Sequence, residues 1–302
     1  LVPGEEYPTP RREEFYERYP EFKASRIKNV IASLGCPFRC SFCFNDSYAK
    51  LYKDHKVRYR TVDAVVDECS SLKQYGTEFI VFQDDCFAMD MGWLADFAVN
   101  YAKRVKIPFH CHLRPEMVTP ERIEWLKIAG CHGVSMGIET FQEEVRKSLL
   151  NRYFSNEQVY KACRLIKDAG LKLRTLQMLG VPFTTLQDEL DLLNMNSEIN
   201  PELARASTFT PYLGTKLADF CKAEGLYDGN NDDLPENFFG LSMLKFENER
   251  KKKTFKLEDI FSTCAKFPRG SHLAQKHIES SIPWADCVKD HLYMECLYSM
   301  GD

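Results

Sequence analysis

NVIASLGCPFRCSFCFN, residues 29–45, joins an apolar run typical of a buried strand to a loop that carries three cysteines. Cys36, Cys40 and Cys43 have the spacing C-x3-C-x2-C, so one short loop brings three soft sulfur donors within reach of one metal centre. Closed structural metal sites use four protein ligands, and three therefore imply an open coordination position. The residues alone leave three alternatives: an iron–sulfur cluster, a zinc site completed by a histidine elsewhere, and three unligated thiols.

Six β-rich runs alternate with longer amphipathic stretches, a pattern typical of βα units around a parallel sheet. The expected strands are 29–35, 78–84, 107–114, 133–139, 171–178 and 204–210. The expected helices are 61–75, 91–105, 120–129, 142–149, 156–169, 185–195 and 215–224. Six units give an incomplete barrel, so the predicted fold class is α/β: a partial (β/α)6 TIM-like barrel of parallel strands with a mainly helical C-terminal extension.

Capping residues mark the ends of several predicted helices. Thr119 and Ser155 are expected N-caps, and Pro120 suits the first helical position. Gly76 and Gly130 stand just past predicted helix ends, where a left-handed C-cap favours glycine. This punctuation supports the alternation of strands and helices.

The alternation stops after Gly225, and the turn formers DGNNDDLPEN that follow predict an exposed loop. We therefore expect three parts: a leader or linker at 1–28, the partial barrel at 29–225, and an extension at 226–302 that covers the barrel mouth. Because the first residue is Leu1 and not Met, we expect an excised or trimmed piece whose leader comes from a missing upstream domain; the alternative is a short chain that works without such a domain.

The C-terminal stretch carries a charged run at 247–253, expected to be a solvated helix face, and helical patterns at 257–264 and 284–298. It also contains Cys264, Cys287 and Cys296. These cysteines could ligate an auxiliary cluster, but their loose spacing favours ordinary buried thiols. The remaining scattered cysteines are expected to be small buried hydrophobic residues.

Composition excludes some partners and compartments. The chain has 40 basic and 44 acidic residues and a formal charge of -4, which gives no electrostatic reason to expect nucleic acid or an anionic membrane. No apolar run approaches the roughly 18 residues needed to span a bilayer, and the N-terminal stretch lacks an apolar signal core. With cysteines placed like reduced thiols, this predicts a cytoplasmic protein with no membrane partner.

Two of the predicted strands place polar side chains on the face that would line a barrel cavity. In the fourth strand, Ser135 and Glu139 share a face with glycines, while the alternate residues are apolar. In the third strand, His110, His112 and Arg114 alternate along one face. They are candidate catalytic residues, as substrate contacts or a proton donor, although hydrogen-bonded core histidines are an equally good interpretation.

CPFRCSFC resembles the cluster-binding loop of the radical S-adenosylmethionine (radical SAM) superfamily, which has an aromatic residue, here Phe42, before the third cysteine. Further segments are similar, in order and spacing, to strand-end motifs of that superfamily: IVFQDDCF at 80–87, HCHLRP at 110–115, GVSMGIET at 133–140, LGVP at 179–182 and TPYLGT at 210–215. The sequence departs from the pattern at Phe183 and Thr184, where relatives commonly carry glycine and glutamate.

The resemblance implies a [4Fe-4S] cluster held by Cys36, Cys40 and Cys43. The fourth iron would bind the amino and carboxylate groups of S-adenosylmethionine, and an added electron would break a carbon–sulfur bond. In most members this liberates a 5'-deoxyadenosyl radical that abstracts hydrogen from an unactivated carbon.

The resemblance also suggests which residues contact the cosubstrate. Asp84 and Asp85 are expected at the methionine amino group, and Glu139 at the ribose hydroxyls. Arg152 matches an arginine that pairs with the methionine carboxylate in the coproporphyrinogen dehydrogenase branch, although a surface arginine remains an alternative. The other expected cofactor contacts are Phe42, Ser135, and the backbone of Gly180 and Val181 at adenine. Arg174 lies inside an apolar strand, so we also expect it to face the lumen and bind a carboxylate; a structural salt bridge is the alternative.

Within the superfamily, the leader, FQDDCF and TPYLGT resemble the branch with an upstream cobalamin-binding domain. This implies hydrogen abstraction, or radical methyl transfer or rearrangement assisted by cobalamin bound outside this chain, on a small molecule or peptide. A single-electron reductant such as flavodoxin or ferredoxin is the implied partner. Methylthio transfer and a non-enzymatic zinc-bound scaffold are the competing hypotheses.

Overall fold

Six strands form a sheet with the hydrogen-bonded order β1-β4-β5-β6-β7-β8 in a computed structural model of the chain. They are β1 (Ile27–Val30), β4 (Phe79–Phe82), β5 (Phe109–Leu113), β6 (Cys131–Glu139), β7 (Lys172–Leu179) and β8 (Leu203–Thr208). Neighbours β1, β4, β5 and β6 pair in parallel, and so do β7 and β8. The strand order and the helices between the strands confirm the predicted partial (β/α)6 barrel.

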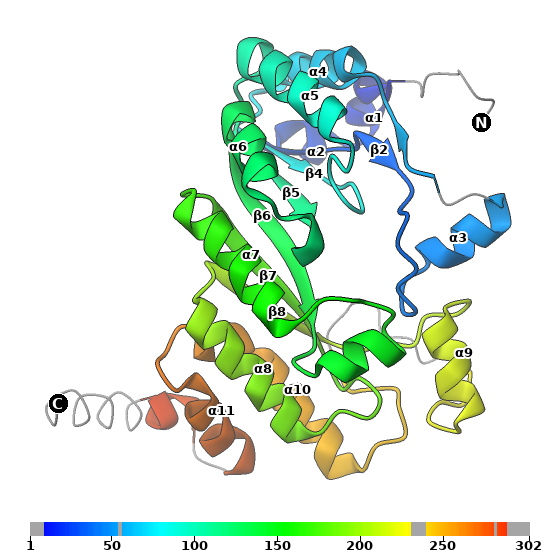
Figure 1. Cartoon of the computed structure of the whole chain (residues 1–302), viewed down its shortest axis with the longest axis vertical. Helices are drawn as coiled ribbons and strands as arrows, with labels where there is room; N and C mark the ends of the chain where they lie inside the picture. Colours follow the sequence, from blue (N-terminus) through cyan, green and yellow to red (C-terminus); the bar gives the residue numbers. More distant parts are fainter. Residues whose placement is uncertain (1–8, 54–55, 231–239, 281–282, 289–302) are drawn as a thin grey trace, which may run out of the picture. The chain divides into compact units, whose positions relative to one another are not determined.

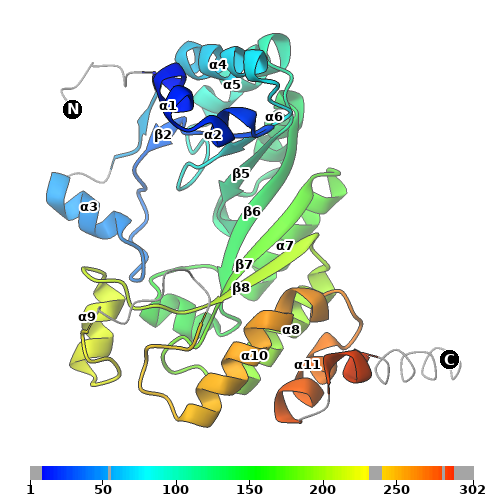
Figure 2. The ribbon, with the colours of Figure 1, turned by 180° about the vertical axis from the view of Figure 1, so that it is seen from behind.

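The structure describes residues 9–53, 56–230, 240–280 and 283–288, which fall into two compact units (Figures 1 and 2). The first unit consists of Leu1–Phe38, Tyr52–Met136 and Lys161–Leu173. The second consists of Arg39–Leu51, Gly137–Tyr160 and Arg174–Asp302. The division into a leader, a barrel and an extension that covers the barrel mouth stays a prediction.

The first predicted strand is wrong in its second half. β1 ends at Val30, and the next strand, β2 (Ser33–Leu34), pairs antiparallel with β3 (Arg58–Tyr59) instead of continuing the main sheet. The cause is a buried carboxylate, because Asp84 accepts hydrogen bonds from the backbone N–H groups of Ala32 and Ser33. These groups are therefore satisfied outside the parallel ladder.

The first unit also contains several helices beside its strands (Figure 1). They are α1 (Arg12–Arg18), α2 (Pro20–Ala24), α4 (Val62–Ser71), α5 (Met91–Arg104) and α6 (Pro120–Ala129), with short 3-10 turns η1 (Leu72–Tyr75) and η2 (Pro115–Met117). Phe97 and Tyr101 of α5 pack edge-on against Phe82 or Phe109 of the sheet, and all four rings are fully buried. Such aromatic contacts stabilise beyond the area they bury.

Several predicted helix boundaries are confirmed. The Thr119 side chain accepts a hydrogen bond from the Arg122 N–H, and Pro120 occupies the first turn. Gly76 and Gly130 are left-handed C-caps with φ of 67° and 84°. The helix predicted at 156–169 is α7 (Asn156–Asp168).

The second unit contains most of the remaining helices (Figure 2). They are α3 (Asn45–Tyr52), the π-helical turn η3 (Val145–Leu149), α8 (Leu186–Ile199), α9 (Lys216–Ala223), α10 (Asn248–Cys264) and α11 (Gly270–Glu279). In α10, Arg250 and Thr254 bond to Glu189 of α8, and Glu258 accepts hydrogen bonds from Thr208 of β8. These contacts hold α8, α10 and β8 together.

Some helices of this unit differ from the prediction. α8 extends to Ile199, beyond the predicted end at 195, because the left-handed residue Asn200 caps it. The charged run at 247–253 lies on a helix as predicted, at the start of the long helix α10, whose N-cap is Glu247. By contrast, α3 and α11 were not predicted. Most of the predicted helix at 284–298 lies outside the described residues. None of the described helices has both the length and the apolar character that crossing a membrane requires.

Candidate active site

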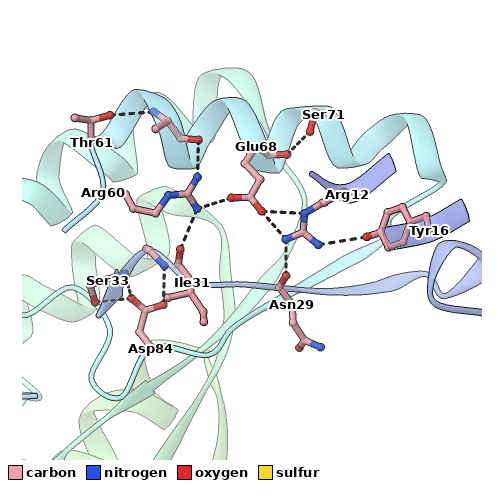
Figure 3. A network of polar contacts seen from close by, with 12 residues as sticks. Arg12, Tyr16, Asn29, Ile31, Ser33, Arg60, Thr61, Glu68, Ser71 and Asp84 are labelled. Carbon is pink, nitrogen blue, oxygen red and sulfur yellow. Dashed lines mark hydrogen bonds and ion pairs between the residues drawn. The ribbon is translucent and has the colours of Figure 1, made fainter. Parts of the chain in front are cut away.

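A buried carboxylate fixes the chain just before the cysteine loop (Figure 3). Asp84 Oδ1 accepts from the Ser33 N–H at 2.5 Å and the Ser33 hydroxyl at 2.6 Å, and Oδ2 accepts from the Ala32 N–H at 3.0 Å. Burial raises the pKa of Asp84 to about 6, and these hydrogen bonds oppose the increase. Both oxygens therefore hold the protein backbone. A contact of Asp84 with the cosubstrate stays a prediction, as does one of the exposed Asp85.

A second network, which sequence reasoning missed, anchors the same segment (Figure 3). Glu68 of α4 is buried and accepts hydrogen bonds from both Arg12 and Arg60. Arg12 also donates to the Asn29 carbonyl at 2.7 Å, and Arg60 donates to the Ile31 carbonyl at 3.0 Å. Two guanidinium groups share the buried carboxylate of Glu68, so its negative charge is compensated. Their further bonds to backbone carbonyls hold the end of β1 in place.

The first half of the cysteine loop packs on an arginine that follows β5. The guanidinium of Arg114 lies 3.7 Å from the ring centroid of Phe38, which stands between the first two cysteines. Glu116 accepts from Arg114 Nη2 at 2.6 Å, so the cation is both stacked and paired. The pKa of Cys36 is lowered, first by a hydrogen bond with the thiol of Cys86. Arg114, predicted as a substrate contact, therefore also orders the loop.

The second half of the loop is tied to two other segments of the second unit. Ser41 donates its hydroxyl to the Leu149 carbonyl at 2.5 Å and its N–H to the Leu150 carbonyl at 3.2 Å. Leu217 at the start of α9 donates to the Ser41 carbonyl at 2.8 Å, and Asn151 donates to the Arg39 carbonyl at 2.7 Å. Ser41 thus positions the backbone between Cys40 and Cys43, although nothing in its residue type signalled this role.

The polar residues predicted on one face of β5 and β6 do come together. His110 Nε2 and the hydroxyl of Ser135 share a hydrogen bond of 2.7 Å, and the rings of His110 and His112 lie 6.1 Å apart. Ser135 is almost fully buried, and the two histidines are half-buried. The His110 ring is therefore hydrogen-bonded within the protein and remains partly exposed.

Glu139 and Arg152 form a buried ion pair in the second unit. Arg152 also donates to the Gly137 carbonyl at 2.9 Å, and a Cβ on Gly137 would overlap the Glu139 carboxylate. Glu139 has φ of 71°, a left-handed conformation that is costly for a non-glycine residue and is often retained at functional sites. The interpretation of Arg152 as a surface arginine is wrong, and its contact with the cosubstrate stays a prediction.

Arg146, which the sequence analysis did not single out, organises the loop between these two residues. It is completely buried on the π-helical turn η3 and donates to the Thr140 carbonyl, the Phe154 carbonyl and Asn156 Oδ1. Burial lowers the pKa of Arg146 to about 10. Single π-turns are frequent at functional sites, and this one was predicted as an ordinary helix.

Phe42 and Val181 meet in one apolar cluster with Leu150, Phe209 and Leu217. The Gly180 N–H donates to Glu189 Oε1 at 2.8 Å, so this donor is already used within the protein. Burial raises the pKa of Glu189 to about 7, and the charge of Arg250 opposes the increase. Binding of adenine by the backbone of Gly180 and Val181 stays a prediction.

Phe183 adopts φ of 65°. This is the position where the sequence departs from the glycine that relatives commonly carry, and the backbone here keeps the conformation that glycine favours. The Phe183 side chain is exposed, and its ring meets Phe220 edge-on at 5.9 Å between centroids. The departure in sequence therefore places a non-glycine residue in a left-handed backbone conformation.

The donor set of the loop suits an iron–sulfur cluster. Cys36, Cys40 and Cys43 form no disulfide within the described residues, and the Cys43 N–H donates to the Cys40 carbonyl in a tight turn. Among the residues that the structure describes, no three His, Cys, Asp or Glu side chains are already gathered as a metal site. Three thiolates on a loop fit a cluster with one open iron, and cluster binding would complete their arrangement. Cys264 and Cys287 are buried thiols, and Cys296 lies outside the described residues.

Curated relatives of this chain include methyltransferases and cyclases. An uncharacterized methyltransferase of Pyrococcus horikoshii is 26% identical over 200 residues, which cover 65% of this chain and 42% of that protein. The anaerobic magnesium-protoporphyrin IX monomethyl ester cyclase of Rubrivivax gelatinosus is 27% identical over 208 residues, which cover 65% of this chain and 35% of the cyclase. The chain thus spans less than half the length of either relative.

Solved structures share the fold. The radical S-adenosylmethionine methyltransferase TsrM of Kitasatospora setae, solved with cobalamin and a [4Fe-4S] cluster bound, aligns with a TM-score of 0.56 at 19% identity. The alignment covers 68% of this chain and 42% of TsrM. The profile of the Radical SAM superfamily matches residues 30–195, which is more than half of the 302 residues and includes the whole cysteine loop. The chain therefore belongs to the Radical SAM superfamily.

Proposed function

We propose that this chain is the catalytic part of a radical enzyme that cleaves S-adenosylmethionine with a [4Fe-4S] cluster held by Cys36, Cys40 and Cys43. The observation that carries the proposal is the three-thiol loop, which lies in the part of the chain that matches the Radical SAM superfamily. Members of that superfamily use this cluster and this cosubstrate. When bound, the cluster supplies the electron that breaks a carbon–sulfur bond of the cosubstrate. The chain itself supplies binding, orientation and exclusion of water.

The residues of the second unit suit the polar ends of the cosubstrate. In the described structure Glu139 and Arg152 neutralise each other. A carboxylate ligand would compete for the fork of Arg152, and hydroxyl donors would compete for the oxygens of Glu139. We assign the methionine carboxylate to Arg152 and the ribose to Glu139, with the apolar cluster of Phe42 and Val181 towards the adenine.

The first unit offers groups that suit the substrate. His110 shares a hydrogen bond with Ser135, and its imidazole is a group that can hold or move a proton. The neighbouring His112 extends the same polar face. Arg114 keeps Phe38 in place and thus acts on the cysteine loop rather than on the reacting carbon.

The reaction we favour is cobalamin-assisted methyl transfer or ring formation at an unactivated carbon. This choice rests on the relatives, which include a methyltransferase and a cyclase, and on the fold shared with a cobalamin-bound methyltransferase. Radical SAM enzymes need a reductant, and we propose a flavodoxin or ferredoxin for this one. None of the eleven cysteines among the described residues forms a disulfide, which supports the proposal of a reducing, cytoplasmic location.

Product analysis tests this proposal. Protein reconstituted with iron and sulfide without oxygen is incubated with dithionite and S-adenosylmethionine, with and without hydroxocobalamin, and the products are measured by mass spectrometry. We expect 5'-deoxyadenosine without cobalamin, and additional S-adenosylhomocysteine or methylcobalamin with it. A methylthio group added to RNA or protein would favour methylthio transfer instead. If a protein that holds four irons does not cleave the cosubstrate, the proposal is refuted.

A further inference from the structure

Large apolar side chains are exposed along α3, the helix that directly follows the cysteine loop (Figure 1). They have the spacing i, i+4, i+7, i+8 of one helical stripe, and each is more than half exposed: Phe44, Tyr48, Leu51 and Tyr52. The buried residues of α3 include Ala49, which lies outside this stripe. A surface helix normally turns its apolar stripe towards the core, so α3 shows the reverse arrangement.

A neighbouring turn extends this exposed apolar surface. The Ser47 hydroxyl donates to the Gly214 carbonyl and so ties the turn to α3, and the adjacent Leu213 is 66% exposed. The rings of Phe44 and Tyr48 meet edge-on at 5.3 Å between centroids. Single exposed apolar residues are ordinary, but a contiguous group of them marks an interaction surface. We call this group the α3 patch: Phe44, Tyr48, Leu51, Tyr52 and Leu213.

The charges beside the α3 patch are net positive. The buried Asp46 Oδ2 lies 3.1 Å from Lys50 Nζ and 3.2 Å from Lys216 Nζ, and both lysine side chains stay about half exposed. Arg39 on the cysteine loop is a further exposed cation, whereas Asp219, one turn after Lys216, is an exposed acid. This local excess of positive charge contrasts with the formal charge of -4 of the chain.

The position and the size of the α3 patch indicate what binds there. Phe44 directly follows Cys43, so the patch begins at the third cysteine of the loop. The rate of electron transfer falls steeply with distance, and a reductant must therefore dock beside the residues that hold the cluster. Stable protein interfaces use about 20–30 residues on each side, whereas electron-transfer encounters are smaller. An apolar centre with a positive rim attracts a protein with an acidic surface.

We propose that the α3 patch docks the single-electron reductant, and that this reductant is an acidic flavodoxin. The inference rests on the proposed function, which requires a reductant, and adds the surface that receives it. The flat apolar edge of a flavin suits the aromatic pair of Phe44 and Tyr48. The reduced flavin loses one electron and the cluster gains it, and no bond is formed or broken.

Binding of a purified flavodoxin to the reconstituted protein tests the surface, measured by interferometry at several salt concentrations. The wild type should bind, and its affinity should fall as salt rises. Leu51→Glu should weaken binding by about tenfold or more, because it removes an apolar contact and opposes an acidic partner. Leu51→Lys removes the same contact and keeps the attraction, so it should weaken binding clearly less.

Two further variants make this comparison specific. Leu213→Glu changes the other segment of the α3 patch and should weaken binding as Leu51→Glu does. Val99→Glu places the same charge at an exposed apolar position on α5, which is 55% exposed, and should bind like the wild type. Equal affinity of the wild type and Leu51→Glu, or equal losses in Leu51→Glu and Leu51→Lys, would overturn the proposal.

Other occupants give different results. If the wild type is a dimer in gel filtration and Leu51→Glu is a monomer, the α3 patch joins two copies of the chain, and the assignment is wrong. If a ferredoxin binds and flavodoxin does not, the choice of a flavin carrier is wrong.

Cleavage of S-adenosylmethionine with two reductants separates this proposal from the proposed function. Dithionite needs no docking surface, so Leu51→Glu should cleave like the wild type with dithionite and more slowly with limiting reduced flavodoxin. Equal rates with flavodoxin would refute the docking surface and leave the proposed function intact. If the cluster-loaded wild type fails to cleave with dithionite, the proposed function is refuted, and flavodoxin binding that depends on Leu51 would still support the surface.

Discussion

The guanidinium carbon of Arg114 lies over the ring of Phe38, 3.7 Å from the ring centroid. Arg114 follows β5, whereas Phe38 stands between Cys36 and Cys40 on the loop after β2. Glu116 holds the other edge of the guanidinium at 2.6 Å and fixes its orientation. The end of one strand thus orders the loop that carries the cysteines.

Arg114→Ala should reduce the iron retained after reconstitution and gel filtration, because the loop loses its stacked partner. A desolvated cation–π contact contributes about 2 kcal/mol, so a similar loss of unfolding free energy is expected. Arg114→Lys keeps the charge but not the planar group and should lie between. Arg164→Ala, on an exposed helix face, is the control. Wild-type iron content in Arg114→Ala would show that the loop does not depend on this contact.

Glu139 and Arg152 should show strong coupling in a double-mutant cycle. Arg152→Met alone leaves a buried carboxylate without its cation, which typically costs about 3–5 kcal/mol of unfolding free energy. Glu139→Gln together with Arg152→Met removes both charges and should cost clearly less than the sum of the single changes. Urea unfolding of the four proteins measures the coupling. Additive effects would mean that the pair contributes nothing as a pair.

Phe183 allows a direct test of backbone strain. Phe183→Ala and Phe183→Gly both lose the contact with Phe220, but only glycine relieves the left-handed conformation at φ of 65°. Phe183→Gly should therefore be more stable than Phe183→Ala by about 1 kcal/mol. Tyr153 is an exposed loop residue that does not have a positive φ, so Tyr153→Ala should be more stable than Tyr153→Gly. The same order at both positions would contradict the interpretation.

Glu189 should make the stability depend on pH. Its pKa is about 7 in the folded protein against the ordinary 4.5, because burial disfavours the charged form. Between these two values the folded state keeps a proton that the unfolded state has lost, so the free energy of unfolding falls as the pH rises from 4.5 to about 7. The full effect is about 3 kcal/mol at most. Glu189→Gln should flatten this slope in urea unfolding, and an unchanged slope would argue against the shifted pKa.

Much of the fold was predictable because hydrophobic alternation and helix caps are local signals. Five of the six predicted strands match β4 to β8, and Thr119 and Gly130 bound α6 as expected. The first strand was predicted too long because its end depends on Asp84, a residue far along the chain. Strand periodicity cannot reveal that such a residue captures backbone donors.

The candidate site was predictable where one residue type carries the chemistry, as with the cysteines. It was not predictable where a side chain acts on another part of the backbone. Ser41 and Arg146 hold loops through carbonyl groups, and such contacts leave no pattern in the sequence. Arg114 was predicted as polar and inward-facing, yet its stacking on Phe38 depends on tertiary packing.

The central claim is that Cys36, Cys40 and Cys43 together hold one [4Fe-4S] cluster with an open iron. The most direct measurement is oxygen-free iron, sulfide and zinc analysis together with electron paramagnetic resonance of the reduced protein. The wild type is compared with Cys40→Ser, and Cys163→Ser is the control at a buried cysteine outside the loop. We predict about four irons per chain and an altered spectrum on addition of S-adenosylmethionine for the wild type and the control, and loss of both in Cys40→Ser. Stoichiometric zinc, or an intact cluster in Cys40→Ser, would contradict the account.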